Sequence, residues 1–233
     1  MKTPWAEHDA ELSEEEFRLL RDFIHERFGL YFDGTQRSSL RGRLAPRLDL
    51  LGLISFEDYY RYLRFAPDRA AEQQRMVSHL TNNETYFFRE QPQLDVLTSH
   101  VLPSLKERRA QAGESLLRVV SVGCSTGEEA LTLAMLLFDS GQFFWGWDVR
   151  VTGIDIDGAA LDKASRGVYH RNSLRAVTPA QLERHFTQQG NGVRVKDSIR
   201  KLVSFRPGNL LDPASYEGLA PADVLFCRNV LIY

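Results

Sequence analysis

The sequence predicts an α/β protein in which an all-helical N-terminal domain precedes an open parallel sheet carrying a small antiparallel β insertion. Hydrophobic residues recur with helical spacing, and do not alternate with period two, before about residue 115. From residue 116 on, short β-branched apolar runs alternate with amphipathic segments, as strands and helices do in a parallel sheet. We expect the two domains to span 1–78 and 79–233.

The N-terminal domain is expected to begin with a helix that starts after Ser13. Ser13 and Glu16 have the spacing of a capping box, and Gly29 ends the amphipathic run that follows. Two more amphipathic runs, at 36–52 and 55–65, predict two further helices.

Four arginines flank the leucine stripe of the helix predicted at 36–52, and no acidic residue lies between Asp33 and Asp49. They are Arg37, Arg41, Arg43 and Arg47. Such a face suits docking of an acidic helix. The alternative is a solvated face whose arginine stems cover the leucines.

The second domain is expected to alternate strands and helices up to Tyr233. The predicted strands are 116–123, 149–157 and 223–233, and the predicted helices are 128–139 and 159–169. Alternating apolar and polar residues predict a hairpin excursion at about 186–206. Because no helix or strand follows the last predicted strand, we expect an incomplete sheet and a chain truncated at its C-terminus.

The segment 121–129, SVGCSTGEE, predicts a ligand site after the first strand. Gly123 and Gly127 allow a tight turn and close approach of a ligand to a helix N-terminus. Neither a P-loop nor the full dinucleotide-binding glycine pattern is present. Glu128 and Glu129 would repel a pyrophosphate and favour a nucleotide-like ligand with a cationic amine. The alternative is a tight turn whose acids cap a helix.

Three more polar residues follow predicted strands at the edge where ligands bind in such folds. Asp155 ends the second strand, where a carboxylate accepts hydrogen bonds from both hydroxyls of an adenosine ribose. The alternative is a helix cap, for which Asp157 is the better candidate. Asn209 and Asn229 also follow short apolar runs.

Composition excludes several classes of protein. With 29 Lys and Arg against 31 Asp and Glu, the net charge of -2 provides no general field for nucleic acid. Two cysteines cannot form a disulfide framework, and the polar N-terminus has no signal-peptide core, so we expect a cytoplasmic protein. No apolar stretch is long enough to cross a membrane, and no ligand spacing predicts a metal site.

Four ordered motifs resemble those of the CheR-type chemotaxis receptor glutamate methyltransferases. They are TNNETYFFRE (81–90), SVGCSTGEE (121–129), TGIDID (152–157) followed by ASRGVY (164–169), and LFCRNVLIY (225–233). The basic run at 36–48 is similar to the family's substrate-docking helix. The resemblance implies a Rossmann-like, S-adenosylmethionine-dependent enzyme that esterifies glutamates on the cytoplasmic helical domain of chemoreceptors, without inserting into the membrane.

The resemblance also implies site residues. Those expected to bind S-adenosylmethionine, or its product S-adenosylhomocysteine, are Asn83, Thr85, Arg89, Gly123, Glu128, Asp155, Asn209, Leu210, Arg228 and Asn229. Tyr86 and Arg89 are expected to orient the substrate carboxylate. A glutamate with its ordinary pKa of about 4.3 is already ionised at neutral pH, so no general base is expected.

Compared with the family that it resembles, the segment 185–195 looks shorter than the loop of members that tether to a receptor C-terminal pentapeptide, so we expect no such tether. The alternative function is a signalling module that binds the cofactor without turnover. A nicotinamide-dependent oxidoreductase is disfavoured by Glu128 and Glu129, and nucleic-acid methylation by the shortness of the basic patch.

Overall fold

The computed structural model describes residues 10–143, 145–219 and 221–230, and the chain divides into two compact units. The first unit contains the residues up to Asn82 together with Asn209–Leu211. The second contains the described residues of Asn83–Gly208 and those from Asp212 to Val230. The division falls between Asn82 and Asn83, slightly after the expected boundary between 78 and 79.

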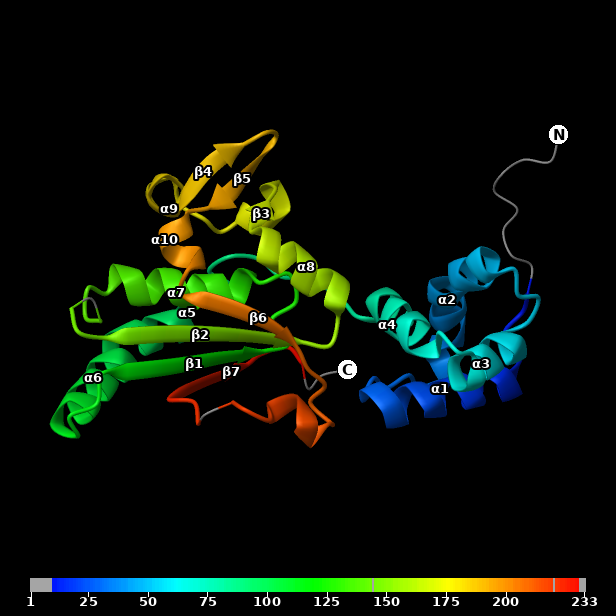
Figure 1. The fold of residues 1–233 in the computed structure, drawn as a ribbon. Helices are drawn as coiled ribbons and strands as arrows, with labels where there is room; N and C mark the ends of the chain where they lie inside the picture. The colour runs from blue at the N-terminus through cyan, green and yellow to red at the C-terminus, as the bar shows by residue number, and fades with distance from the viewer. Residues whose placement is uncertain (1–9, 144, 220, 231–233) are drawn as a thin grey trace. The chain divides into compact units, whose positions relative to one another are not determined.

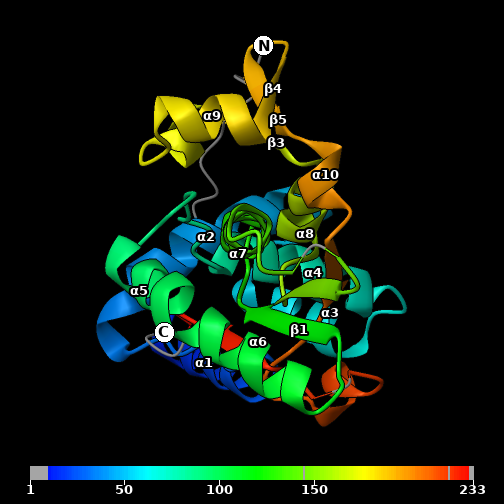
Figure 2. The same ribbon diagram turned by 90° about the vertical axis from the view of Figure 1, so that its left-hand side faces the viewer.

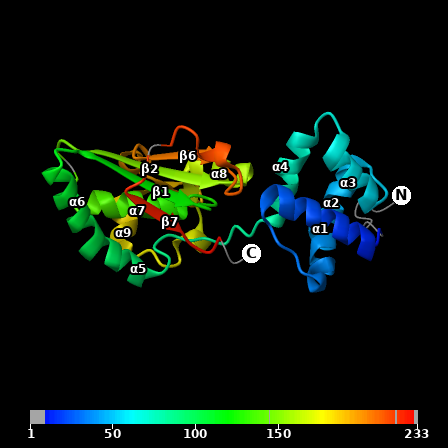
Figure 3. The same ribbon diagram turned by 90° about the horizontal axis from the view of Figure 1, so that it is seen from below.

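The first unit is helical. Its elements are α1 (Glu14–Phe28), the 3-10 turn η1 (Gly34–Gln36), α2 (Arg37–Leu51), α3 (Phe56–Phe65) and α4 (Arg69–Leu80). The predicted capping box is confirmed, since the Ser13 hydroxyl accepts from the Glu16 amide and the Glu16 carboxylate accepts from the Ser13 amide. Helices α1 to α4 lie together (Figure 3), and most of the apolar side chains buried in this unit are leucine and phenylalanine.

A buried ion pair joins α2 to α4. Arg47 donates from Nε and NH2 to the two oxygens of Glu72 at 2.8 and 2.6 Å, and the Tyr59 hydroxyl donates to Glu72 Oε1 at 2.9 Å. Arg47 is 8% exposed and Glu72 is fully buried. This corrects the expectation that Arg47 belongs to a docking surface, because its guanidinium is taken up inside the helical unit.

The second unit is built on a parallel sheet with the strand order β6-β2-β1-β7 (Figure 1). The strands are β1 (Leu116–Val122), β2 (Asp148–Asp155), β6 (Val203–Pro207) and β7 (Val224–Cys227). The helices around this sheet are α5 (Gln91–Val96), the π turn η2 (Leu97–Val101), α6 (Leu102–Gln111), α7 (Glu128–Asp139) and α8 (Gly158–Arg166).

Helices α7 and α8 lie on one face of the parallel sheet, as the right-handed crossovers β1–α7–β2 and β2–α8–β6 require. The connection from β6 to β7, which contains η4 (Pro213–Tyr216), runs along the opposite face (Figure 1). Alternate residues of β1 accordingly pack in two directions. Leu117 and Val119 belong to the core beneath α7, and Val120 and Val122 pack with Ile154 on the other side.

A small antiparallel sheet with the order β3-β5-β4 follows α8 (Figure 2). Its strands are β3 (Val168–Tyr169), β4 (Phe186–Gln189) and β5 (Gly192–Val195). The same segment also contains η3 (Arg171–Leu174), α9 (Pro179–His185) and α10 (Asp197–Arg200). The predicted excursion thus ends earlier than expected. Val203–Pro207 forms β6 of the parallel sheet, because period-two alternation marks a strand without naming its partner.

Two further findings concern the described part of the chain. No helix within it has the length and apolarity that crossing a membrane requires. It also contains no group of three or more histidine, cysteine or acidic side chains arranged to hold a metal ion.

Candidate functional site

The carboxyl ends of three parallel strands meet at one edge of the sheet and carry the polar residues of the candidate site. Val122, the last residue of β1, pairs in register with Ile154 of β2 and with Cys227 of β7. At this edge Gly123, which follows β1, therefore lies between Asp155 of β2 and Arg228, which follows β7. This is the position at which open parallel sheets bind ligands.

The loop after β1 needs glycine at two positions. Gly123 has φ +67°, and a Cβ atom built there would lie 2.2 Å from Val230 Cγ2. Gly127 has φ +93°, and its Cβ would lie 2.6 Å from the Ala164 Cβ of α8. Both the left-handed backbone and the close packing exclude a side chain. The loop backbone consequently turns tightly from β1 into α7.

Asp155 holds the glycine loop against the loop that follows β2. Its carboxylate accepts from the Ser125 amide at 2.6 Å through Oδ2 and from the Asp157 amide at 2.9 Å through Oδ1. Asp155 is 8% exposed, and burial raises its pKa above the ordinary value for aspartate. Each oxygen keeps acceptor capacity, since a carboxylate has about four lone-pair sites.

Asp157 is the cap of α8, as the sequence suggested. Its Oδ1 accepts from the amides of Ala159 and Ala160 at 3.0 and 3.2 Å. The second oxygen accepts from Asn83 Nδ2 at 2.7 Å, and Asn83 Oδ1 accepts from the Ser125 hydroxyl at 2.8 Å. Asn83 thereby ties the start of the 83–90 segment to both loops.

Glu128 is buried at the N-terminus of α7 with 2% of its surface exposed. Its two oxygens accept from the Thr126 hydroxyl at 2.7 Å and from the Ser173 hydroxyl at 2.8 Å. Burial raises its pKa above the ordinary glutamate value, and these two hydrogen bonds oppose that rise. The site therefore presents two buried carboxyls, Asp155 and Glu128.

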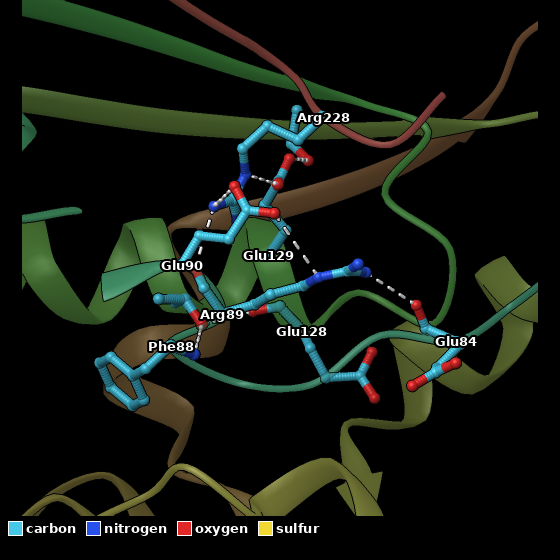
Figure 4. Close-up of polar contacts among 9 residues, drawn as sticks. Glu84, Phe88, Arg89, Glu90, Glu128, Glu129 and Arg228 are labelled. Atoms are coloured by element: carbon cyan, nitrogen blue, oxygen red, sulfur yellow. Dashed lines mark hydrogen bonds and ion pairs between the residues drawn. The ribbon is translucent and has the colours of Figure 1, made fainter. Parts of the chain in front are cut away.

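Two arginines lie beside the ring of Tyr86 (Figure 4 shows Arg89). The Arg175 guanidinium carbon is 3.7 Å from the ring centroid and the Arg89 carbon is 5.7 Å from it. Arg89 NH1 donates to the Glu84 carbonyl at 3.1 Å, and Arg175 NH2 pairs with the Glu84 carboxylate at 3.0 Å. Arg175 is 42% exposed at its side chain. The Glu90 carboxylate lies 3.9 Å from Arg89 Nε, so both guanidinium groups lie beside the aromatic ring and each has a carboxylate neighbour.

Arg228 follows β7 and its side chain points at the 83–90 segment (Figure 4). It donates from Nε to Glu129 Oε2 at 2.6 Å and from NH1 to the Arg89 carbonyl at 2.9 Å. The resemblance assigns Arg228 to cofactor binding, and in the structure its guanidinium contacts protein groups. Its neighbour Asn229 has φ +56°.

The other residues predicted to bind the cofactor fall in different units of the chain. Thr85 is half-buried between Asn83 and Tyr86. Asn209 and Leu210 belong to the first unit, where Asn209 Nδ2 donates to the Arg27 carbonyl at 2.8 Å, so their place in the site stays a prediction.

Of the remaining docking arginines, Arg37 is exposed. Arg41 donates to the Ala10 carbonyl at 2.9 Å and Arg43 to the Leu80 carbonyl at 2.5 Å.

Sequence reasoning assigned no role in the site to Ser125, Ser173 and Arg175. Ser125 lies inside the recognised glycine motif, which was the signal that could have found it. Ser173 and Arg175 come from the η3 region, 45 or more residues along the chain from the groups they contact. No local pattern links residues so far apart.

Two family models match the chain. Residues 15–81 match the all-alpha domain of CheR methyltransferases, and residues 83–233 match the SAM-binding domain of CheR methyltransferases. The two matches together cover most of the sequence.

Similar curated proteins include three from different bacteria. The chain is 34% identical over 223 residues to chemotaxis protein methyltransferase 2 of Vibrio cholerae, covering 95% of this chain and 76% of that protein. It is 37% identical over 228 residues to the chemotaxis protein methyltransferase of Escherichia coli, covering 95% and 75%. The probable biofilm formation methyltransferase WspC of Pseudomonas putida is 37% identical over 214 residues, covering 91% of this chain and 48% of that protein.

The donor set fits S-adenosylmethionine, the cofactor named by the family model. Buried carboxyls with acceptor capacity left, Asp155 and Glu128, suit ribose hydroxyls and a cationic amine. Gly123 and Gly127 keep the turn beside them free of side chains. The sheet-edge site, both domain models and the relatives agree: the chain belongs to the CheR family of S-adenosylmethionine-dependent chemotaxis methyltransferases.

Proposed function

We propose that this chain transfers a methyl group from S-adenosylmethionine to glutamate side-chain carboxylates on the cytoplasmic helical domain of chemoreceptors. The observation that carries the proposal is the pairing of two kinds of site in one unit. Buried acids suited to the cofactor lie at the sheet edge. Arg89 and Arg175 are partly exposed, suit a carboxylate and lie beside the ring of Tyr86. Asn83 ties the segment 83–90, which carries Tyr86 and Arg89, to that edge.

Within this proposal the chain binds and aligns the reactants. Asp155 accepts hydrogen bonds from the ribose hydroxyls, and Glu128 accepts a hydrogen bond from the amine of the cofactor. When bound, S-adenosylmethionine supplies a sulfonium methyl group, whose transfer to a carboxylate oxygen leaves S-adenosylhomocysteine and a methyl ester. Arg89 and Tyr86 orient the carboxylate, which is ionised at neutral pH and gives up no proton. Alignment of the reacting groups is therefore the main task of the protein.

Transfer of a labelled methyl group to purified receptor tests the proposal. We expect label in the receptor that is released as methanol by mild base, as an ester releases it. A receptor whose glutamates have been replaced by glutamine is the control and is expected to accept none. Cofactor binding without transfer to any receptor would favour a signalling module without turnover. Label stable to base would contradict glutamate esterification.

Docking of an acidic receptor helix is proposed for two α2 arginines, the exposed Arg37 and the half-buried Arg41. We expect Arg37→Glu with Arg41→Glu to raise the KM for receptor about tenfold at low salt, because reversed charges repel an acidic partner. Binding of S-adenosylhomocysteine should be unchanged. The matched control is Arg61→Glu with Arg64→Glu on α3, which makes the same charge change at exposed positions. An equal rise in KM for both pairs would contradict a specific docking face.

We propose in addition that the protein works in the cytoplasm and without a receptor-tail tether. A two-residue turn, Gly190 and Asn191, joins β4 to β5, which supports the absence of a tethering loop. Tight binding of a receptor tail pentapeptide would contradict it.

Cofactor affinity is expected to fall at mildly acidic pH. Burial raises the pKa values of Asp155 and Glu128 above the ordinary carboxyl value of about 4. Binding requires both carboxylates to be ionised. Affinity is therefore lost as the pH falls through these raised pKa values. The free energy of unfolding changes with pH in the opposite direction. A carboxyl whose folded pKa is raised favours the folded state more as it becomes protonated.

Titration with S-adenosylhomocysteine between about pH 8 and about pH 5, with thermal melts at each pH, checks this. Glu128→Gln should flatten the dependence, because one titrating group is removed, and Glu107→Gln on the exposed face of α6 should not. Constant affinity across the range would contradict the prediction.

A further inference from the structure

We infer that Glu129 is a positioning residue for Arg89 and acts through Arg228. The inference rests on the proposed function, in which Arg89 orients the substrate carboxylate. Its basis is a chain of contacts: Glu129 Oε2 accepts from Arg228 Nε at 2.6 Å, and Arg228 NH1 donates to the Arg89 carbonyl at 2.9 Å. One guanidinium thus joins α7 to the backbone of the residue that orients the substrate (Figure 4).

The pair is fixed at its α7 end. Glu129 Oε1 accepts from the hydroxyl of the fully buried Ser121 of β1 at 2.7 Å. The side chains of Arg228 and Glu129 are 11% and 12% exposed, and the Glu90 carboxylate lies 3.8 Å from Arg228 NH1. A largely buried carboxylate held by a hydroxyl of the central strand gives the guanidinium one preferred orientation, and a planar fork reaches two acceptors at once.

The backbone on both sides of Arg89 needs such a restraint. Phe88 and Glu90 both have φ +58°, and Asn229, which follows Arg228, has φ +56°. Among the described residues the other non-glycine residue in the left-handed region is Ser125, also in the site. These conformations persist only where surrounding contacts impose them. The Phe88 amide is held by the Thr132 hydroxyl of α7 at 3.2 Å, and the Arg89 carbonyl is held by Arg228.

The direction of the Arg89 side chain follows from this backbone. A turn with left-handed residues on both sides of Arg89 sets the Cα–Cβ direction from which its guanidinium reaches the Glu84 carbonyl and the Tyr86 ring. Relaxation of Phe88 or Glu90 to an ordinary φ would redirect that bond. A displacement of about 1 Å in a positioning group costs about 100-fold in rate.

The first test is amide hydrogen exchange on the full chain. Glu129→Gln removes the charge and keeps the shape of the side chain. Arg228→Lys keeps the charge and loses the second nitrogen donor. Each variant should speed exchange of the Phe87 and Phe88 amides at least about tenfold and leave the interior of α7 unchanged. Asp148→Asn, which breaks an exposed ion pair with Arg150, is the control and should have no effect there. Wild-type exchange in both variants would overturn the inference.

The second test separates positioning from general support of the fold. Glu129→Gln should lower kcat/KM for receptor about tenfold in the wild-type background and by less than about twofold in an Arg89→Ala background. In the second background Arg89 has no guanidinium whose orientation Glu129 could set. Equal losses in the two backgrounds would overturn the inference. If the wild type methylates no receptor, the proposed function fails, and the exchange experiment still decides the role of Glu129.

Discussion

Asp155→Ala is expected to weaken binding of S-adenosylhomocysteine at least about 100-fold. Two hydrogen bonds from ribose hydroxyls to a buried carboxylate contribute roughly 1.5–3 kcal/mol each, and both are lost together. The substitution also leaves the amides of Ser125 and Asp157 without their acceptor, so the glycine loop loses one of its hydrogen bonds to β2. Calorimetric titration beside a thermal melt measures the two effects separately.

The outcome distinguishes a ligand-binding role from a loop-holding role. Asp155→Asn should weaken binding less than the alanine variant, because its one oxygen still accepts, but its amide NH2 must face either the Ser125 or the Asp157 amide. Asp162→Asn, at an exposed position on α8, should bind like the wild type. Unchanged affinity in Asp155→Ala with a cooperative melt would remove Asp155 from the site.

The parts of this site that could be predicted are those set by local sequence. A strand, a glycine turn and a helix follow one another within 116–139, so the order of residues alone places Gly123, Gly127 and Glu128 together. Asp155 could be placed because the parallel register brings the end of β2 to the same edge. The helix cap formed by Asp157 is equally local.

The parts that could not be predicted depend on pairs that are distant in sequence. Arg228 and Glu129 are 99 residues apart, and Ser173 and Glu128 are 45 apart. A single sequence shows the charge of each side chain and not its partner. The segment 203–207 illustrates the same limit for strands, since its alternation was recognised and its pairing with β2 was not.

Arg47 shows why a charge pattern on one helix is insufficient. Its spacing with the other α2 arginines suggested an exposed face, and its partner Glu72 lies on α4, a helix that the sequence analysis did not predict. A segment in which polar residues outnumber apolar ones, as in RAAEQQRMVSHL, gives a weak periodic signal. Burial of an arginine is decided by whether a carboxylate accompanies it.

Glu72→Ala is expected to have the largest effect on stability, a loss of roughly 3–5 kcal/mol in the free energy of unfolding. The substitution leaves the Arg47 guanidinium buried without a counter-charge and the Tyr59 hydroxyl without its acceptor. Glu14→Ala, which removes an exposed partner of Arg18 on α1, should cost less than about 1 kcal/mol. Urea unfolding followed by circular dichroism, with amide exchange in α4, measures both.

The double variant Arg47→Met with Glu72→Leu decides what the ion pair contributes. Removing both charges eliminates two desolvation penalties and fills the space with apolar groups, so we expect the double variant to be more stable than Glu72→Ala. If it is as stable as the wild type, Coulomb attraction between Arg47 and Glu72 does little more than offset their dehydration. A double variant less stable than the wild type would mean that the hydrogen bonds to Glu72 hold α2, α3 and α4 in register and that the pair is a source of net stability.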